Sequence, residues 1–275
     1  MSISSISNLK VLVVIPTYNE QESINLLIYQ LNKLNMAHLN ILIIDDNSPD
    51  GTADYVENLG LPNIDILRRS HKSGLGSAYK DAIKYALSKS SPSKAQDFEY
   101  LVSMDGDGSH QVQDLQTMLE TLIQIKSKES DQQLSKISLI LGSRWVPGGG
   151  IRNWSKPRIW LSKAGTKYAR FALRLPINDL TGGFRIYPRN TLEHIDLDQI
   201  TSNGYCYQIE MAFAVDHLNK KLGLETIELP ITFVERANGV SKMNFKIVLE
   251  AMWQVTKLGL GLRLRPKADK LHYVK

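Results

Sequence analysis

Two aspartates separated by a single residue, Asp105 and Asp107, form the pattern with the clearest chemistry in the sequence. Two carboxylates this close repel each other unless a cation lies between them, so the pair predicts a Mg²⁺ or Mn²⁺ site that holds a diphosphate. Ser109 stands two residues further on and is the third oxygen ligand in this interpretation, whereas His110 is expected to form a structural hydrogen bond. The alternative is a solvated acidic turn, because Asp-Gly-Asp-Gly also favours turns.

A second acidic pair, Asp45 and Asp46, follows an apolar run. These carboxylates are expected either to hydrogen-bond a nucleotide base or ribose, or to stabilise the turn and cap the next helix. The small residues at 74–78, Gly76 among them, would let a helix N-terminus approach a ligand closely. They do not follow a clear strand and the sixth position is Tyr79, so a dinucleotide fingerprint is discounted.

Residues 152–175 contain seven Lys or Arg and no acidic residue. Helical spacing places a basic stripe beside an aromatic and apolar stripe, as in a helix that lies in a membrane interface. The residues expected at that interface are Trp160, Lys163, Lys167 and Phe171. The alternative is a helix packed on the core with a solvated basic side. A closing helix at 243–262, followed by basic residues, repeats the pattern and favours a membrane surface.

Composition limits the classes of protein that remain. The chain has 275 residues and a net charge of +5, with 20 Lys+Arg and 11 Asp+Glu in residues 151–275, or +9, which leaves residues 1–150 at −4. The basic half predicts an anionic partner, and nucleic acid is not expected because no stacking motif or groove-reading helix accompanies the charge. One cysteine excludes an intrachain disulfide, and no apolar run is long enough to span a membrane, so a cytoplasmic protein is expected.

Strand and helix patterns alternate along the first 145 residues, which predicts a doubly wound α/β fold. Buried strands are expected at 10–16, 40–45, 99–104 and 137–143, with a weaker one at 64–67, and helices at 20–34, 52–59, 76–88 and 114–126. A β-rich stretch is expected at 225–234. Because ligands bind beyond the carboxyl ends of such strands, the acidic clusters are expected to meet at one edge of the sheet.

The sequence lacks the motifs of several enzyme classes. No phosphate-binding Gly-x-x-x-x-Gly-Lys-Ser/Thr loop and no Gly-x-Ser-x-Gly nucleophile elbow occurs, and Cys206 stands in no motif that supports a nucleophile.

Eight motifs in order make the chain resemble the family 2 glycosyltransferases, and most closely the polyprenol phosphate mannose synthases. They lie at residues 14–20, 44–52, 74–76, 104–110, 142–144, 153–154, 183–185 and 239–242. The resemblance implies a GT-A (Rossmann-like) fold: a mixed, mostly parallel sheet flanked by helices, with amphipathic interface helices in the C-terminal half. It is expected to form one domain, residues 1–262, with a nucleotide-sugar half at about 1–145, an acceptor and membrane-facing half at about 146–262, and a basic tail at 263–275.

The resemblance also implies the reactants and the residues that bind them. The donor would be GDP-mannose, the acceptor a polyprenyl monophosphate, and the cofactor Mg²⁺ or Mn²⁺ on Asp105, Asp107 and Ser109. Residues expected to bind GDP-mannose are Pro16, Tyr18, Glu20, Asp45, Asp46, Gly76 and Asp105. Residues expected to act on phosphate are Arg144, Arg158, Arg236 and Lys242, of which Arg144, Arg236 and Lys242, with Asp107, are expected to be catalytic. Asp-Gly-Asp replaces the Asp-Ala-Asp of many relatives, which leaves both ligands in place.

The implied reaction is an inverting transfer that gives a β-linked mannosyl phosphate. The acceptor phosphate has a second pKa near ~6 and needs no strong general base. Glu210 is therefore expected to be structural, although a general-base role is the alternative. The protein would lie on the cytoplasmic face of a membrane, with a separate membrane-anchoring protein as a further partner. The competing functions are a UDP-sugar transferase with a lipid phosphate or hydroxyl acceptor, and a non-catalytic nucleotide or lipid sensor.

Overall fold

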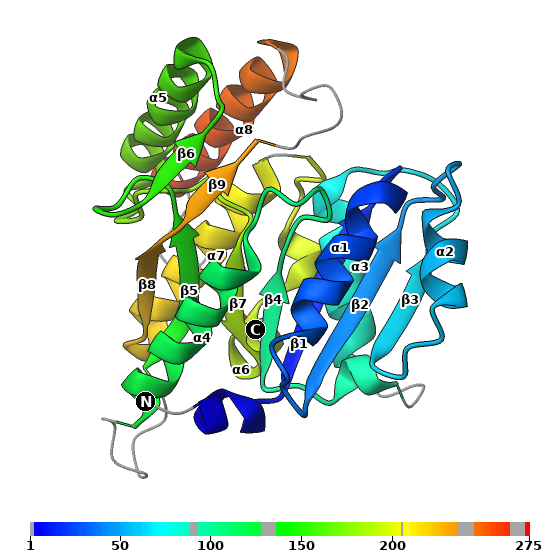
Figure 1. Ribbon diagram of the computed structural model, residues 1–275. Coiled ribbons are helices and arrows are strands. Elements are labelled where there is room, and N and C mark those ends of the chain that lie inside the picture. Colours follow the sequence, from blue (N-terminus) through cyan, green and yellow to red (C-terminus); the bar gives the residue numbers. More distant parts are fainter. Residues whose placement is uncertain (1–2, 89–92, 128–135, 205, 236–244, 265–272) are drawn as a thin grey trace.

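A seven-stranded sheet forms the centre of the computed structural model (Figure 1). The structure describes residues 3–88, 93–127, 136–204, 206–235, 245–264 and 273–275. The strand order is β3-β2-β1-β4-β7-β5-β8, and a second sheet pairs β6 with β9. The strands are β1 (Val11–Thr17), β2 (Leu39–Asp45), β3 (Ile64–Arg68), β4 (Tyr100–Ser103), β5 (Ile137–Ser143), β6 (Gly150–Arg152), β7 (Arg185–Pro188), β8 (Glu225–Pro230) and β9 (Thr232–Val234). Only β7 runs antiparallel to its neighbours in the main sheet.

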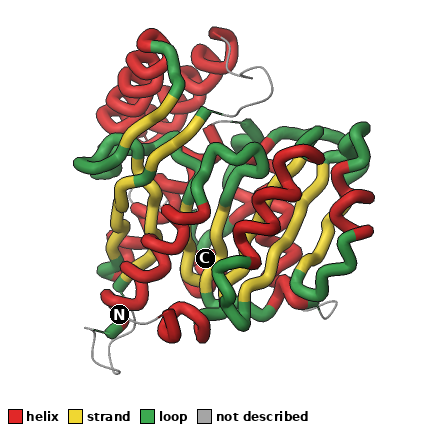
Figure 2. The backbone as a smooth tube through the Cα atoms, viewed as in Figure 1, coloured by secondary structure: helices red, strands yellow, loops and turns green. Residues whose placement is uncertain are grey.

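Helices cover both faces of this sheet (Figure 2). The α-helices are α1 (Gln21–Asn32), α2 (Thr52–Asn58), α3 (Leu75–Leu87), α4 (Val112–Lys126), α5 (Lys156–Leu173), α6 (Arg189–His194), α7 (Cys206–Leu222) and α8 (Phe245–Leu264). Short 3-10 helices lie at Ile3–Asn8, Lys94–Gln96 and Leu197–Gln199. The mostly parallel, helix-flanked α/β sheet expected from the sequence is confirmed.

Alternating strand residues feed two hydrophobic clusters. In β1, Leu12 and Val14 pack in a cluster with residues of α3 and α7, whereas Val11 and Val13 pack in a second cluster with α1 and α4. Because successive side chains on a strand point to opposite faces, a strand buried on both faces needs a continuous apolar run. The Val- and Ile-rich runs of the sequence meet this requirement.

α5 and α8 form a separate pair of helices that lies beyond the carboxyl end of the main sheet, next to β6 and β9 (Figure 1). The two helices approach closely where a Cβ on Gly259 would lie 2.9 Å from the Ala172 carbonyl oxygen. A hydrogen bond of 2.5 Å also joins the hydroxyls of Tyr168 and Thr256. Within the part of the chain that the structure describes, no helix combines the length and apolarity needed to cross a bilayer.

Residues 273–275, which the sequence assigns to a basic tail, lie against the body of the protein. Val274 forms an antiparallel bridge with Ile195, and Tyr273 is buried. This contact returns the end of the chain to the loop between α6 and α7.

Candidate active site

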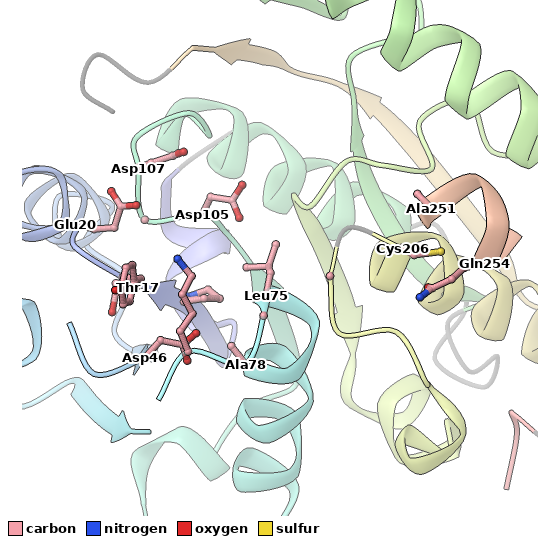
Figure 3. Close-up of a pocket in the computed structure, with 16 residues that line it drawn as sticks. Thr17, Glu20, Asp46, Leu75, Ala78, Asp105, Asp107, Cys206, Ala251 and Gln254 are labelled. Atoms are coloured by element: carbon pink, nitrogen blue, oxygen red, sulfur yellow. The ribbon is translucent and has the colours of Figure 1, made fainter. Parts of the chain in front are cut away.

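A cavity of about 340 Å³ opens beyond the carboxyl ends of β1, β2 and β4 (Figure 3). The residues that line it come from six segments: Pro16, Thr17, Tyr18 and Glu20; Asp46; Lys72, Gly74, Leu75 and Ala78; Asp105, Gly106 and Asp107; Gly204 and Cys206; and Ala251 and Gln254. We call it the larger cavity, to distinguish it from a smaller one described below. Figure 3 shows Glu20, Asp105 and Asp107 on one side of the larger cavity, and Cys206, Ala251 and Gln254 on the other. The expected meeting of acidic clusters at one edge of the sheet is thus observed.

Only one carboxylate of the 45–46 pair lines the larger cavity. Asp45 is buried and accepts hydrogen bonds from the Thr17 hydroxyl at 2.9 Å and from the backbone N–H and hydroxyl of Ser48 at 2.8 and 2.6 Å. Asp45 therefore stabilises the turn after β2, the alternative that the sequence left open, and does not line the cavity. Asp46 is the member of the pair that points into the cavity.

A largely buried arginine, Arg69, holds Asp46 in place. Arg69 Nη1 lies 2.5 Å from Asp46, Nη2 donates to the Ser77 hydroxyl at 2.6 Å, and Nε lies 3.1 Å from Asp81. Burial raises the pKa of Asp46, and the opposing effect of Arg69 offsets this only in part. The result is an oriented carboxylate that can accept N–H or O–H groups of a ligand.

An aromatic ring and a cation face the same cavity. Lys72 Nζ lies 3.7 Å from the centre of the Tyr18 ring, a cation–π contact. Glu20 accepts a hydrogen bond from the Ser23 hydroxyl at 3.2 Å, and that hydroxyl also donates to the Gly106 carbonyl at 2.8 Å. The loops after β1 and β4 are therefore tied together beside the aspartates.

Asp105 and Asp107 line the larger cavity and also a smaller one of about 120 Å³. The Asp105 N–H donates to Nδ1 of His110, whose ring stacks on Phe184 at 4.7 Å. His110 thus has the structural role expected from the sequence. Asp107 accepts the Ser109 N–H at 3.0 Å. Because both carboxylates line both cavities, they lie at the junction of the two.

The oxygen atoms at this junction fit a divalent cation. The Ser109 hydroxyl is buried and has no hydrogen-bond partner among the described residues. Those residues contain no group of three or more His, Cys, Asp or Glu able to enclose a metal. Two carboxylates and a hydroxyl suit Mg²⁺ or Mn²⁺, which take their other ligands from water and substrate phosphate. Asp105, Asp107 and Ser109 are the residues that would hold the ion.

Two arginines and a tryptophan line the smaller cavity. Arg144 is held by Asp179, which accepts its Nε at 2.7 Å and its Nη2 at 2.6 Å. Among the described residues, Nη1 is the guanidinium nitrogen of Arg144 left for a ligand. Arg158 pairs with Glu235 and lies 3.9 Å from the centre of the Trp154 ring. Nε of Arg158 and Nε1 of Trp154 are buried without a hydrogen-bond partner among the described residues.

Comparison with known proteins identifies the family. The family model described as glycosyl transferase family 2 matches residues 12–196. The chain belongs to glycosyl transferase family 2. It is 40% identical over 257 residues to an undecaprenyl-phosphate mannosyltransferase of Micrococcus luteus, which covers 93% of this chain and 96% of the relative. It is 38% identical over 258 residues to a polyprenol monophosphomannose synthase of Mycolicibacterium smegmatis, which covers 93% and 89%.

Solved structures support the fold of this family 2 glycosyltransferase. Glucosyl-3-phosphoglycerate synthase of Mycobacterium tuberculosis, in complex with Mn²⁺, UDP-glucose and phosphoglyceric acid, superposes with a TM-score of 0.63 at 16% identity, over 96% of this chain and 84% of that one. The same enzyme with Mg²⁺ and UDP gives a TM-score of 0.59. The GT-A fold expected from the motifs is confirmed.

Gly76 does not line either cavity of this glycosyltransferase. A Cβ at position 76 would lie 2.6 Å from Cβ of Tyr207 and 2.9 Å from the Ser202 carbonyl oxygen. The close packing of α3 against the start of α7 therefore requires a glycine at this position. Gly74 and Leu75 are the residues of this turn that face the larger cavity.

The four residues expected at a membrane are all exposed on α5. Trp160 and Phe171 expose 72% and 78% of their surface, and Lys163 and Lys167 are also exposed. On the neighbouring helix α8, Trp253 exposes 69% of its surface. We call these five side chains the α5–α8 face. Arg236 and Lys242, the other two predicted phosphate-binding residues, lie outside the described residues.

Reasoning from the sequence missed several residues of the site, among them four with polar or charged side chains. Lys72 and Gln254 line the larger cavity, and Asp179 and Glu235 hold the two arginines of the smaller one. No local pattern marks these residues, because each acts with partners that are distant in the sequence.

Proposed function

We propose that this protein is an inverting glycosyltransferase that moves mannose from GDP-mannose to a polyprenyl monophosphate, giving polyprenyl phosphate β-mannose and GDP. The observation that carries the proposal is the position of Asp105 and Asp107 between a larger cavity and a smaller cavity lined by two arginines. In this proposal the nucleotide sugar binds in the larger cavity and the anionic acceptor in the smaller. The names of the two mannosyltransferase relatives support mannose and a polyprenyl phosphate.

The larger cavity would orient the donor. Asp46, fixed by Arg69, offers carboxylate oxygens to the N–H groups of a guanine base, and the Tyr18 ring and Pro16 offer flat apolar surface. Lys72 brings positive charge to the same wall. Asp105, Asp107 and Ser109 would hold a divalent cation, which would neutralise the departing diphosphate.

The smaller cavity would orient the acceptor phosphate. The guanidinium groups of Arg144 and Arg158, which line this cavity, would bind its oxygens. One phosphate oxygen attacks the anomeric carbon of mannose, a new carbon–oxygen bond forms, and the bond to the diphosphate breaks with inversion. Since the acceptor is largely dianionic above its second pKa of ~6, no side chain has to remove a proton. Arg236 and Lys242 complete the proposed set of catalytic cations.

The α5–α8 face would place the smaller cavity against the lipid. Aromatic rings beside lysines are the composition of a helix surface that binds an anionic membrane. Lys163 Nζ lies 4.9 Å from the ring of Trp145, which follows Arg144 directly, so this face adjoins the acceptor cavity. The protein would act on the cytoplasmic face of the membrane, where a separate membrane-anchoring protein would be a further partner.

A radiolabelled transfer assay tests the reaction. GDP-mannose, GDP-glucose, UDP-glucose and UDP-N-acetylglucosamine are each offered with a polyprenyl phosphate and Mg²⁺, with and without a chelator. Labelled lipid from GDP-mannose alone, lost with the chelator, is expected. Label from a UDP-sugar alone would refute the donor. A wild-type protein that forms no product, together with an Asp107→Ala variant that has lost nucleotide binding, would favour a sensor.

Flotation with anionic vesicles at low salt tests the membrane surface. Wild type is expected to float, and the Lys163→Glu, Lys167→Glu variant to remain in the dense fraction. A matched control, Lys33→Glu with Lys126→Glu, makes the same change of charge at two exposed positions, directly after α1 and at the end of α4, and should float. Equal flotation of wild type and the α5 variant would contradict the proposal.

A further inference from the structure

The loop at residues 200–204 forms part of the wall of the larger cavity. Gly204 lines the cavity, and the Asn203 carbonyl accepts the N–H of Gly76 at 2.8 Å. A Cβ at Gly74 would lie 2.4 Å from that same carbonyl oxygen, so the loop is in direct contact with the turn before α3. Any movement of residues 200–204 therefore changes the position of Gly74 and Leu75 in the cavity.

A fully buried carboxylate, that of Glu210, forms hydrogen bonds with this loop. Glu210 on α7 accepts the backbone N–H of Ser202 at 2.8 Å and that of Thr201 at 3.1 Å, with the Thr201 hydroxyl at 3.3 Å. A buried carboxylate is costly unless hydrogen bonds replace the lost water, and these donors supply that replacement. Neither cavity is lined by Glu210, so its carboxylate is directed at the loop and away from the reactants.

The remaining donor to Glu210 comes from the last described segment of the chain. The Tyr273 hydroxyl donates to Glu210 at 3.1 Å, across 63 positions of sequence. The ring of Tyr273 meets Phe213 edge-on at 5.5 Å. The Tyr273 carbonyl accepts the Asp196 N–H at 2.9 Å, and the Lys275 N–H donates to the His194 carbonyl at 2.8 Å. Residues 273–275 are thus docked by main-chain bonds, and the Tyr273 hydroxyl connects them to Glu210, the residue that binds the loop.

The loop is also joined to the helix that carries part of the α5–α8 face. The Ser202 hydroxyl donates to Oε1 of Gln254 at 2.8 Å, and Gln254 itself lines the larger cavity. On the opposite side, Lys80 Nζ donates to the Ile200 carbonyl at 2.9 Å and to Asn203 Oδ1 at 2.8 Å. Three elements, α3, α7 and α8, therefore form hydrogen bonds with this loop, and the segment 273–275 reaches it through Glu210.

We propose that Glu210 is a positioning residue for the donor nucleotide, and that Tyr273 makes the shape of the larger cavity depend on the docking of residues 273–275. Glu210 sets the loop, the loop sets Gly74 and Leu75, and these residues contact the ligand. The assignment rests on the proposed function only in taking the nucleotide to bind in the larger cavity. It also gives the buried carboxylate at position 210 a role, although the proposed reaction needs no general base.

The test uses Tyr273→Phe and Glu210→Gln in the full chain. Tyr273→Phe keeps the ring against Phe213 and removes only the hydroxyl. The matched control is Tyr29→Phe, at a tyrosine on α1 whose side chain is 56% exposed. Three quantities are measured for each protein: the Kd of GDP with Mg²⁺, the kcat and its pH profile, and the alkylation rate of Cys206 by N-ethylmaleimide. Cys206 is the single cysteine, is buried and lines the cavity beside the loop, so its labelling reports loosening of the loop without any nucleotide.

Tyr273→Phe removes one hydrogen bond to the Glu210 carboxylate. It is therefore expected to raise both the Kd of GDP and the alkylation rate of Cys206 by roughly 3- to 10-fold. The kcat should stay within twofold of wild type, and its pH profile should be unchanged. Glu210→Gln should shift both quantities further in the same direction. Tyr29→Phe should behave as wild type in all three measurements.

Two results would overturn the inference. One is a folded Tyr273→Phe variant with wild-type GDP affinity and wild-type alkylation. The other is a Glu210→Gln variant whose kcat falls more than a hundredfold, with one limb of the pH profile lost and the Kd unchanged, which is the behaviour of a general base. If wild type fails to bind GDP, the proposed donor is wrong and the alkylation rates alone decide the role of the loop. If Glu210→Gln does not fold, Tyr273→Phe decides it.

Discussion

Replacing Asp179 with asparagine should destabilise the protein more than any exposed charge change. Asp179 is fully buried, and its carboxylate accepts Nε, Nη2 and the backbone N–H of Arg144 at 2.7, 2.6 and 3.0 Å, and the Gly182 N–H at 3.1 Å. Asparagine keeps the shape but loses the charge, and its amide N–H₂ must face groups that also donate. Arg144, itself buried, is left without a counter-charge, which costs about 3–5 kcal/mol of unfolding free energy.

The loss of unfolding free energy in Asp179→Asn is expected to depend on pH. Burial acts to raise the pKa of Asp179, but the charge and hydrogen bonds of Arg144 outweigh it and hold the pKa below its ordinary value. A carboxyl whose folded-state pKa is lowered stabilises the protein above its unfolded pKa of about 3.9 and loses that contribution as the pH falls through the folded pKa. The difference in unfolding free energy between wild type and Asp179→Asn should therefore be complete at pH 7 and should shrink as the pH falls into the acid range.

Urea unfolding followed by circular dichroism measures both effects. Asp97→Asn is the matched control, because Asp97 pairs with Lys10 on the surface and its side chain is 63% exposed, so its unfolding midpoint should match that of wild type. A loss below about 1 kcal/mol for Asp179→Asn at pH 7 would refute the reasoning, since it would fall in the range of an ordinary hydrogen bond. A double change, Asp179→Leu with Arg144→Met, should recover most of the stability but no acceptor turnover.

Other parts of the structure make three further predictions. Gly76→Ala forces a Cβ to within 2.6 Å of Tyr207 and should cost about 1–3 kcal/mol in thermal unfolding, whereas Gly165→Ala, which has nothing within 4 Å, should be neutral or stabilising. GDP binding should weaken as the pH falls through the pKa of Asp46, which burial raises above 3.8, and Asp46→Asn should bind weakly at pH 7 without this acid dependence, as measured by calorimetry. Trp253→Ala removes a side chain that is 69% exposed, so the melting temperature should hold while vesicle flotation falls.

The strands buried on both faces could be predicted because their signal is local. Expected strands at 10–16, 40–45 and 137–143 correspond to β1 (Val11–Thr17), β2 (Leu39–Asp45) and β5 (Ile137–Ser143). The antiparallel β7 (Arg185–Pro188) carries no such run, because its four residues include an arginine and a proline. Arg185 is nevertheless fully buried, since its guanidinium donates to the carbonyls of Gly182 and Leu180 and to the Tyr187 hydroxyl. Those acceptors come together only after folding.

Helix α7 was missed for a related reason. It is buried on nearly every side, including the polar residues Gln208, Glu210 and Asp216. A helix that packs on all faces lacks the alternation of apolar and polar stripes by which a surface helix is found in a sequence. In the sequence, the polar residues of this helix interrupt the apolar spacing expected of a buried helix. In the structure, they are buried inside the protein.

The site was predictable where chemistry lies within a few residues, and not where partners are distant. Asp105 and Asp107 stand in one turn, and their spacing alone indicated a cation site. The choice of Asp46 over Asp45 depends on which side chain points to the cavity at the end of β2. Asp179 lies 35 positions from Arg144, and nothing in the sequence relates the two before they meet in the fold.

The central physical problem of the proposed transfer is the approach of two anions, a sugar diphosphate and a lipid phosphate. The structure places the two carboxylates that would hold a cation between the cavities, and puts Lys72 on the donor side and Arg144 and Arg158 on the acceptor side. Each of these arginines already has a carboxylate partner, Asp179 or Glu235. Such pairs fix the guanidinium groups before the substrate arrives, so less reorganisation is needed during the reaction. Because Glu235 is partly exposed and Asp179 is not, an incoming phosphate can displace the first more readily than the second. Arg158 would therefore exchange its partner for the lipid phosphate, whereas Arg144 would keep Asp179 and act through its remaining nitrogen.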